Sequence, residues 1–158
     1  MSDDKIKTAV FPGSFDPFTI GHESVVRRAL EMFDRVIIGI GSNTTKTSFF
    51  PLEKRIEGIR KVFEDTGGRV VVKIFKGLTV DFCKAEKSHY ILRGLRTAAD
   101  FEYERAIAQT NKAMYPEIET VFLLTLPQHT HVNSSIIREI IKQGGDASQF
   151  LPKGFMLD

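Results

Sequence analysis

The sequence predicts a doubly wound α/β domain in which helices cover both faces of a single five-stranded parallel sheet. Three observations lead to this fold class. Short apolar runs rich in β-branched residues alternate with longer segments in which apolar residues recur at helical spacing. Glycine or proline marks most of the boundaries between these segments. The chain has 158 residues, which is the usual size of one domain.

Five segments have the composition of buried strands. They are short and mostly apolar, and they comprise residues 8–11, 35–40, 69–75, 90–92 and 120–124. Pro12-Gly13 closes the first strand, and Gly41-Ser42-Asn43 closes the second. Buried strands of this kind are typical of parallel sheets, because helices cover both of their faces.

Each strand is followed by a segment with helical spacing of its apolar residues. The expected helices comprise residues 22–33, 51–66, 78–87, 100–115 and 134–143. Pro51 suits the first position of the second helix, Gly67-Gly68 ends it, and Pro116 stops the fourth. Parallel neighbours need crossover connections, so the regular alternation of strand and helix predicts a parallel sheet.

We expect residues 1–158 to form a single domain, since no linker, repeat or low-complexity tract interrupts the pattern. The C-terminal tail, at about residues 146–158, is too apolar for a free end. It contains Phe150, Leu151, Pro152 and Phe155. We expect it to pack on the domain or on a neighbouring subunit.

The composition limits the classes of function. Lys and Arg number 22 against 20 acidic residues, the net charge is +2, and no run of five like charges occurs. Nucleic-acid-binding proteins normally carry a concentrated basic face. No apolar stretch approaches the roughly 20 residues that cross a bilayer, no apolar leader precedes Asp3, and Cys83 has no second cysteine to pair with. We therefore expect a cytoplasmic protein that binds neither nucleic acid nor membranes.

The five segments that follow the strands are rich in anion-binding groups. They are residues 12–22, 42–46, 76–79, 93–96 and 127–135. In an open parallel sheet, ligands bind beyond the carboxyl ends of the strands, where these segments meet. We therefore expect six side chains to surround one hollow large enough for a triphosphate. They are Thr19, His22, Lys46, Arg93, Arg96 and Ser134.

The segment after the first strand has the features of a phosphate site. Gly13 permits a tight turn with close backbone approach, and Gly21 stands at the mouth of the first helix. His22 lies in the first helical turn, where free N–H groups and the helix dipole already favour a phosphate. The alternative is that His22 is a solvated first-turn residue and Thr19 only a helix cap, because short motifs often match by chance.

Arg93 and Arg96 flank a glycine directly after the fourth strand, so that two guanidinium groups can reach one polyphosphate. The alternative is a pair of surface ion pairs with acidic residues of the next helix. Those residues are Asp100, Glu102 and Glu104. Either arrangement uses the charge of both arginines.

The last helix is preceded by Asn133, Ser134 and Ser135, and we expect one of the three to cap it. Capping and phosphate binding are compatible, because both use the same end of the helix.

Other residues carry weaker signals. Lysines in polar loops are usually solvated, and we expect the same of Lys46. His129 and His131 lie two apart without a third ligand nearby, so we expect no protein-held metal site, and Cys83 lies among apolar residues of the core. The sequence contains no P-loop, no Gly-x-Gly-x-x-Gly after a strand and no nucleophile elbow. These patterns predict a phosphate-rich site without a covalent catalyst.

Several motifs in this order are shared with one enzyme family. They are Pro12-Gly13-Ser14-Phe15-Asp16-Pro17, Thr19-Ile20-Gly21-His22, Leu92-Arg93-Gly94-Leu95-Arg96 with Asp100-Phe101-Glu102-Tyr103-Glu104, and Val132-Asn133-Ser134-Ser135. Over nearly its whole length the chain resembles bacterial phosphopantetheine adenylyltransferases, of the nucleotidyltransferase superfamily with the Thr/His-x-Gly-His motif. The resemblance implies a Rossmann-like fold and transfer of the adenylyl group of ATP to 4'-phosphopantetheine. The implied products are dephospho-coenzyme A and pyrophosphate, with Mg²⁺ assisting ATP, and the implied assembly is a homohexamer.

The resemblance also implies site residues by position. Those that would contact phosphopantetheine are Ser14, Lys46, Thr79 and Arg93. Those that would bind ATP are Ser14, Phe15, His22, Gly94, Leu95, Arg96, Glu104, His129, Thr130, His131, Val132, Asn133, Ser134 and Ser135. The chain departs from many members at Ser14, where threonine is common, and at Asn133, where serine is usual. The His129 to His131 stretch also differs from the tryptophan-containing version of some members.

Adenylyl transfer to a phosphate monoester requires alignment of the two reactants and does not require a protein base. A phosphate monoester has a second pKa of about 6, so it is largely a dianion at neutral pH and can attack the α-phosphorus itself. We hypothesise that His22 and Lys46 hold the α-phosphoryl group in the transition state. Arg96 and the helix end at Ser134 and Ser135 would hold the β and γ phosphates.

Two rival functions remain open at this point. A sibling nucleotidyltransferase would act on nicotinamide mononucleotide or make a cytidylyl product, and the superfamily motif alone does not separate it. A non-catalytic nucleotide-sensing module would bind ATP without forming a product. A tRNA synthetase fragment is disfavoured because the chain is short and lacks a Lys-Met-Ser-Lys-Ser loop.

Overall fold

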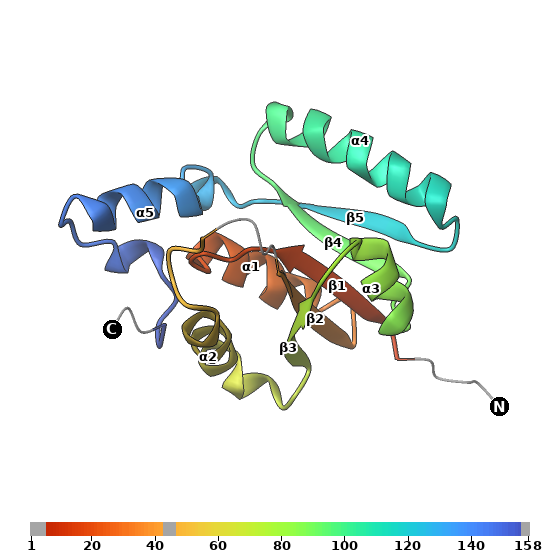
Figure 1. Cartoon of the computed structure of the whole chain (residues 1–158), viewed down its shortest axis with the longest axis horizontal. Helices are drawn as coiled ribbons and strands as arrows, with labels where there is room; N and C mark the ends of the chain where they lie inside the picture. The colour runs from red at the N-terminus through yellow and green to blue at the C-terminus, as the bar shows by residue number, and fades with distance from the viewer. Residues whose placement is uncertain (1–5, 43–46, 156–158) are drawn as a thin grey trace.

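The computed structural model describes residues 6–42 and 47–155 (Figure 1). The strands are β1 (Thr8–Gly13), β2 (Arg35–Gly41), β3 (Val70–Phe75), β4 (Tyr90–Leu95) and β5 (Glu119–Leu124). The helices are α1 (Ile20–Ala29), α2 (Leu52–Val62), α3 (Thr79–Ala85), α4 (Ala98–Met114) and α5 (Ser134–Lys142). Short 3₁₀ turns occur at Glu64–Thr66, Pro127–His129 and Ser148–Phe150.

The strands form one parallel sheet in the order β3-β2-β1-β4-β5. The chain starts in the middle of the sheet, winds outward to β3, and then crosses back to place β4 beside β1. The strand order therefore reverses between β1 and β4, and the segments that leave these two strands diverge. Such a switch point is where ligands bind in open α/β sheets. The predicted fold class is confirmed.

Alternating strand residues bury two apolar clusters on opposite faces of the sheet. On one face Phe11 and Ile38 pack with Val26 of α1 and Ile59 of α2. On the other face, Val10, Ile37 and Ile91 pack with Val80 and Cys83 of α3. Cys83 is fully buried, as predicted, and burial raises the pKa of its thiol to about 12. Helices thus cover both faces of the sheet.

Two strands are longer than the sequence pattern predicts by more than one residue. β1 continues through Pro12 to Gly13, and β4 continues through Arg93 to Leu95. The expected strand ends were wrong because backbone pairing with the neighbours β2 and β5 overrides the local proline and glycine signals. As a consequence, Arg93 is fixed within a strand and does not lie on a loop.

The helix boundaries also differ by a few residues. α1 begins at Ile20, two residues before the predicted start, and α2 begins at Leu52 with Pro51 as its N-cap residue. α2 ends at Val62, and the chain then forms a 3₁₀ turn before Gly67, whose φ of 62° is left-handed. Glycine adopts that conformation without steric cost.

The C-terminal part of the described chain forms a third apolar cluster with α5. Ala147 and Leu151 are buried there together with Val132 and Ile137, and Ile20 at the start of α1 packs against them. Figure 1 shows α5 and the following turn beside the sheet and not stacked on it. The start of α5 is therefore held close to the start of α1.

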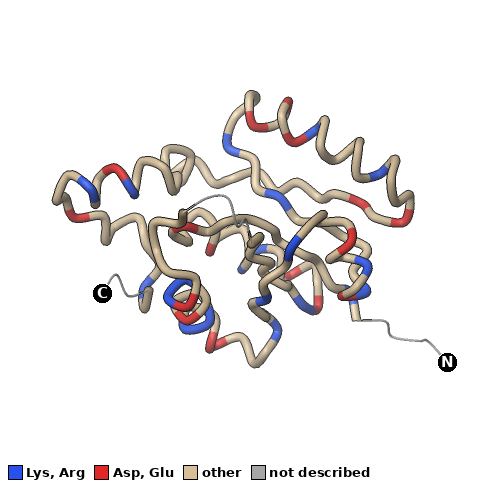
Figure 2. The backbone as a smooth tube through the Cα atoms, viewed as in Figure 1, with Lys and Arg blue, Asp and Glu red and all other residues tan. Residues whose placement is uncertain are grey.

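Charged residues of both signs are interspersed along most elements of the chain (Figure 2). α2, for example, carries Glu53, Lys54 and Glu57 as well as Arg60 and Lys61. None of the helices in the described ranges combines the length and the hydropathy that a membrane crossing requires.

Candidate active site

The largest group of predicted site residues lines one cavity at the switch point of the sheet. This cavity, called the His22 cavity, has a volume of about 450 Å³. Its walls come from β1, α1, β4, α4 and the segment before α5. The lining residues include Phe11, Pro12, Gly13, Ser14, Phe15, Thr19, Gly21, His22, Arg93, Gly94, Arg96, Asp100, Tyr103, Glu104, His129, Val132, Asn133 and Ser134.

His22 is fixed by a capping box at the start of α1. The His22 N–H donates to Thr19 Oγ1 at 3.2 Å, and the Thr19 N–H donates to His22 Nδ1 at 3.0 Å. A backbone N–H can only donate, so Nδ1 is an acceptor and the ring proton lies on Nε2. Thr19 is therefore a helix cap, as the alternative prediction stated. Its capping partner His22 also presents the Nε2–H group as a donor.

The surroundings of His22 keep its ring neutral. Phe11, Phe15 and Phe18 enclose it, with ring centroids 5.0 to 6.1 Å away. Removal of water by this enclosure lowers the pKa of His22 to about 3, and the positive charges of Arg93 and Arg96 add to the effect. The solvated first-turn histidine of the alternative prediction is thus wrong, because the ring is half-buried and part of the cavity wall.

The turn after β1 brings the backbone close to the cavity. Phe15 has a φ of 48°, which is left-handed and uncommon for a residue with a side chain. Its ring is buried against Gly13, where an added Cβ would lie only 2.9 Å from Phe15 Cζ. Glycine at position 13 therefore allows the phenyl ring to fold beneath the turn, and Ser14 and Phe15 both line the cavity.

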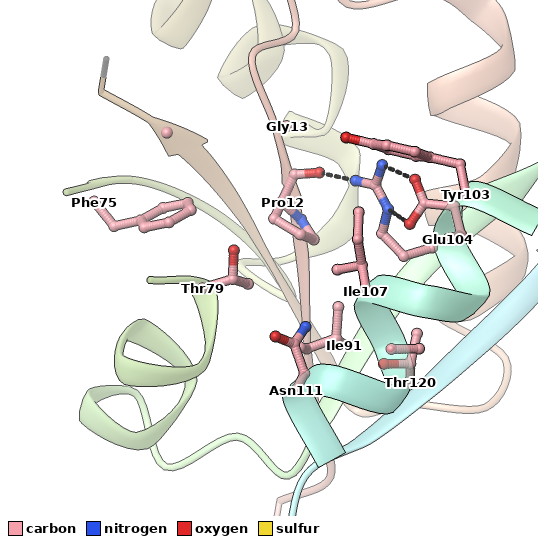
Figure 3. Close-up of a pocket in the computed structure, with 13 residues that line it drawn as sticks. Pro12, Gly13, Phe75, Thr79, Ile91, Tyr103, Glu104, Ile107, Asn111 and Thr120 are labelled. Carbon is pink, nitrogen blue, oxygen red and sulfur yellow. Dashed lines mark hydrogen bonds and ion pairs between the residues drawn. The ribbon is translucent and has the colours of Figure 1, made fainter. Parts of the chain in front are cut away.

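Arg93 forms a forked ion pair with Glu104. Its Nη2 and Nε donate to the two Glu104 carboxylate oxygens at 2.6 and 3.0 Å, and Nη1 donates to the Pro12 carbonyl at 2.6 Å (Figure 3). Glu104 is buried, with 8% of its surface exposed. The guanidinium plane is therefore held at three points between β1 and α4.

Arg96 and Asp100 form a second pair at the start of α4. Asp100 Oδ2 lies 3.3 Å from Arg96 Nε and accepts from the Arg96 N–H at 3.1 Å. Both arginines therefore make the ion pairs of the alternative prediction, and both also line the His22 cavity. Each pair keeps a guanidinium at the cavity wall.

The N-terminus of α5 points at the same cavity. Asn133 is its cap, since Oδ1 accepts from the Ile136 N–H at 2.9 Å. The Ser134 hydroxyl donates to the Pro17 carbonyl at 2.8 Å, which joins α5 to the turn after β1. Free N–H groups of a first helical turn and the positive end of its dipole favour an anion there.

A second cavity of about 290 Å³ lies between the sheet and α4 (Figure 3). This α4 cavity has mainly apolar walls with a few amide and hydroxyl groups. Its lining comprises Pro12, Gly13, Gly41, Phe75, Thr79, Ile91, Arg93, Tyr103, Glu104, Ile107, Ala108, Asn111 and Thr120. Pro12, Gly13, Arg93, Tyr103 and Glu104 line both cavities, so the two cavities share a wall.

Three residues of α4 that line this cavity were not predicted as site residues from the sequence. Tyr103, Ile107 and Asn111 follow one another at intervals of four residues and project from one face of α4 (Figure 3). That spacing was a visible signal, because residues four apart lie on one side of a helix. The spacing did not predict a binding face, because the three side chains are aromatic, aliphatic and amide and so do not form an apolar stripe.

The structure brings most of the predicted site residues to these two cavities. Of the residues predicted at ATP, those that line the His22 cavity are Ser14, Phe15, His22, Gly94, Arg96, Glu104, His129, Val132, Asn133 and Ser134. Four other residues predicted at ATP are sequence neighbours of lining residues but do not themselves line the cavity. They are Leu95, Thr130, His131 and Ser135. Of the residues predicted at phosphopantetheine, Thr79 and Arg93 line the α4 cavity, Ser14 lines the His22 cavity alone, and Lys46 lies outside the described residues.

The described residues contain no group of three or more His, Cys, Asp or Glu side chains that could hold a metal ion. The two carboxylates that line the His22 cavity, Asp100 and Glu104, are each bound by an arginine. The chemistry of this cavity is therefore that of donors and positive charges directed at an anion.

Comparison with known proteins finds relatives over nearly the whole chain. A family model described as cytidylyltransferase-like matches residues 10–140. The phosphopantetheine adenylyltransferase of Cytophaga hutchinsonii is 51% identical over 92% of this chain and 97% of its own length. That of Phocaeicola vulgatus is 49% identical over 97% of this chain and 100% of its own length, and that of Leptospira biflexa is 46% identical over 91% and 89%.

Solved structures share the fold at much lower identity. A bifunctional NMN adenylyltransferase/ADP ribose pyrophosphatase from Francisella tularensis superposes with a TM-score of 0.71 at 20% identity over 93% of this chain. The match spans 45% of the Francisella chain. A putative nicotinate-nucleotide adenylyltransferase from Vibrio parahaemolyticus gives a TM-score of 0.65 at 18% identity, over 93% of this chain and 94% of its own. With identities of 45 to 51% to curated relatives over more than nine-tenths of its length, the chain belongs to the phosphopantetheine adenylyltransferase family.

Proposed function

We propose that this protein transfers the adenylyl group of ATP to 4'-phosphopantetheine, which yields dephospho-coenzyme A and pyrophosphate. The observation that carries the proposal is the shared wall between two cavities of different character. The His22 cavity is lined by anion-binding donors, and the α4 cavity is mainly apolar with a few amide and hydroxyl groups. A polyphosphate fits the first, and an extended chain with amide groups fits the second.

ATP would occupy the His22 cavity as its Mg²⁺ complex. Mg²⁺ usually binds through one or two carboxylates together with phosphate oxygens, and the carboxylates of this cavity are already bound by arginines. The polyphosphate oxygens would therefore carry the ion into the site. Arg96 and the N-terminus of α5 at Ser134 would hold the β and γ phosphates.

The acceptor phosphate would reach the α-phosphorus across Gly13 and Arg93, because these residues line both cavities. A phosphate oxygen of the acceptor forms the new bond to the α-phosphorus. The bond from the α-phosphorus to the bridging oxygen of pyrophosphate breaks, and pyrophosphate leaves with that electron pair. An acceptor that is already a dianion loses no proton in this step, so no protein base is required.

His22 would stabilise the transferring group as a neutral donor. Its proton lies on Nε2, and its pKa of about 3 keeps the ring uncharged at neutral pH. A fixed donor at the transferring phosphoryl group needs no reorganisation during the reaction. Lys46, which lies outside the described residues, is proposed as the second group at the same phosphoryl oxygen.

The bound chain of the acceptor would lie along α4. Asn111 and Thr79 offer an amide and a hydroxyl to its polar groups, and Ile91 and Ile107 provide apolar contacts. We propose Tyr103, Ile107 and Asn111 as additional acceptor-binding residues.

Self-association is proposed on the basis of exposed apolar side chains around α4. They are Phe101 and Met114 of α4 and Leu124 at the end of the neighbouring β5, and each has at least 40% of its surface exposed. Large apolar side chains exposed on neighbouring elements indicate an interaction site. We propose that the partner is further copies of this chain, with six copies as the resemblance implies, and that the assembly works in the cytoplasm where ATP is made. Native mass spectrometry gives the copy number directly, and a monomer at micromolar concentration would contradict this proposal.

One assay tests the function. The protein is incubated with ATP, Mg²⁺ and 4'-phosphopantetheine, and dephospho-coenzyme A is measured by mass spectrometry together with pyrophosphate release. Parallel reactions contain nicotinamide mononucleotide, or CTP in place of ATP. Product with phosphopantetheine and ATP alone is expected. Preferential product with another pair would indicate a sibling transferase, and ATP binding without any product would indicate a sensing module.

A further inference from the structure

The end of β1 and the turn that follows it are held by three arginines, which donate to the carbonyls of alternate residues. Arg93 of β4 donates to the Pro12 carbonyl at 2.6 Å. Arg55 of α2 donates to the Ser14 carbonyl at 2.7 Å, and Arg138 of α5 donates to the Asp16 carbonyl at 2.7 Å. Three separate elements thus fix the peptide planes between the end of β1 and Asp16.

Arg55 is the most buried of the three. Only 7% of its surface is exposed, and its Nε also donates to the Phe50 carbonyl at 3.1 Å. Within the described residues it has no carboxylate within ion-pair distance. A buried cation without a counter-charge is costly, and apolar residues usually fill such positions at least as well. Its two carbonyl acceptors therefore indicate a role in backbone orientation.

The Ser14 carbonyl and the Phe15 N–H belong to the same peptide plane. This peptide is trans, so its C=O and N–H point in opposite directions. The carbonyl points at Arg55, which is not among the residues that line the His22 cavity, whereas Ser14 and Phe15 both line it. The N–H side of the plane is therefore the side that faces the cavity.

The Phe15 N–H is available to a ligand. In the described part of the chain no acceptor bonds to it, whereas the carbonyls of Ser14, Asp16 and Pro17 each accept a hydrogen bond. The left-handed φ of Phe15 is the conformation that one residue of an anion-binding backbone turn adopts. His22 lies on the same cavity wall and presents its own N–H donor.

We propose that Arg55 is a positioning residue for nucleotide binding, which acts by fixing the Ser14–Phe15 peptide so that the Phe15 N–H points at a phosphate in the His22 cavity. The inference rests on the proposed function for the identity of the nucleotide. Arg55 touches no substrate in this account and acts through the backbone of the turn. Nothing in its local sequence marks it, since Ser14 lies 41 residues away in the chain.

Kinetics of two matched variants test the proposal. Arg55→Met removes both hydrogen bonds and keeps much of the apolar stem, and Arg60→Met makes the same change at an exposed position of α2. We expect Arg55→Met to lower kcat/KM for ATP about 10²-fold, as small misplacements in active sites do, with the KM for phosphopantetheine unchanged. Arg60→Met should behave as the wild type. Equal effects on the two KM values, or no difference between the variants, would overturn the proposal.

Nuclear magnetic resonance tests the same step without turnover and with a milder variant, Arg55→Lys. Carbonyl-¹³C serine combined with ¹⁵N phenylalanine selects the Ser–Phe peptides, which are Ser14–Phe15 and Ser48–Phe49. In the wild type, Mg²⁺-ATP should shift the Phe15 amide strongly. The Phe49 amide, which donates to Asp16 Oδ2 at 2.7 Å, is the internal reference. In Arg55→Lys the Phe15 shift should shrink while that of Phe49 stays the same.

The outcomes separate this inference from the proposed function. If the wild type forms no dephospho-coenzyme A, the proposed function is wrong, and the amide measurement still reports whether ATP reaches Phe15. If the wild type is active and the Phe15 amide responds equally in Arg55→Lys and wild type, the role of Arg55 is wrong. Melting temperatures of all variants without ligand show that each is folded. If Arg55→Met does not fold, the same kinetic comparison is made with Arg55→Lys.

Discussion

The two sides of the active site are held in different ways. The wall formed by the turn after β1 and the starts of α1 and α5 is joined by hydrogen bonds between distant segments, and buried Phe15 and Phe18 lie beneath it. The wall formed by α4 has Glu104 as its one buried residue among the helix positions, and Tyr103 next to it is 70% exposed. One wall is fixed by the protein interior, and the other is attached through several side-chain pairs, of which Arg93–Glu104 is the most buried.

This difference corresponds to what each reactant needs. Transfer of a phosphoryl group depends on donors placed in advance around developing charge, so the wall with His22 has to be rigid. Binding of a flexible acceptor depends on contacts that can adapt, and the proposed self-association would cover the exposed side of α4. Changes at the rigid wall should therefore affect turnover, whereas changes along α4 should affect acceptor affinity.

The largest effect is expected at His22. Replacement by alanine removes a preorganised donor, and the loss of one such donor typically lowers turnover by about 10² to 10³. Steady-state rates of pyrophosphate release measure the change. His89→Ala, at an exposed histidine before β4, is the matched control and should keep full activity. Turnover near the wild-type value in a folded His22→Ala protein would contradict the assignment.

The Arg93–Glu104 pair should give the next largest effect. Glu104→Gln removes the charge from the fork with Arg93 and leaves the guanidinium poorly oriented. We expect a loss of about 1 to 3 kcal/mol in the free energy of unfolding and a rise of about tenfold in the KM for phosphopantetheine. Glu102→Gln makes the same change at an exposed residue of α4 and should leave both quantities unaltered.

A substitution at Asn111 tests whether the α4 wall acts on phosphopantetheine alone. Asn111→Ala removes one amide from the α4 cavity, so we expect the KM for phosphopantetheine to rise about threefold to tenfold while that for ATP stays the same. Gln109→Ala, on the exposed side of α4, serves as the control. An equal rise in both KM values would show that the two walls are not independent.

The smallest effect concerns stability in mild acid. The folded state lowers the pKa of His22 to about 3, so between about pH 6.5 and pH 3 the unfolded chain takes up a proton that the folded chain does not. This contribution to stability is complete above pH 6.5 and is lost progressively below it. His22→Gln keeps a side-chain acceptor for the capping box. Its free energy of unfolding should fall less than that of the wild type between about pH 7.5 and pH 6. Parallel curves in urea for the two proteins would contradict the enclosed neutral histidine.

The fold and the convergence of the loops follow from the sequence because both depend on periodic patterns. The alternation of buried strands with helices predicts the parallel sheet, and the sheet then places the segments with His22, Arg93, Arg96 and Ser134 at one edge. Strand ends were less predictable, because β1 and β4 extend through Gly13 and Leu95 by pairing with their neighbours.

Contacts across long stretches of sequence were not predictable. Arg138 reaches the Asp16 carbonyl from 122 residues away, and Arg55 is one of several arginines with no distinguishing local pattern. The face of α4 that lines the α4 cavity carries aromatic, aliphatic and amide side chains. Their spacing of four residues is therefore not recognisable in the sequence as an apolar helix face. Such residues become visible only when the elements are packed together.

The direct meeting of the two reactants across Gly13 and Arg93 is tested best by stereochemistry at the α-phosphorus. ATP with a chiral phosphorothioate at that position is converted with phosphopantetheine, and the configuration of the dephospho-coenzyme A analogue is determined by ³¹P spectroscopy. A single in-line displacement between adjoining cavities predicts inversion. Retention would require two displacements through a covalent enzyme intermediate, and would contradict the account.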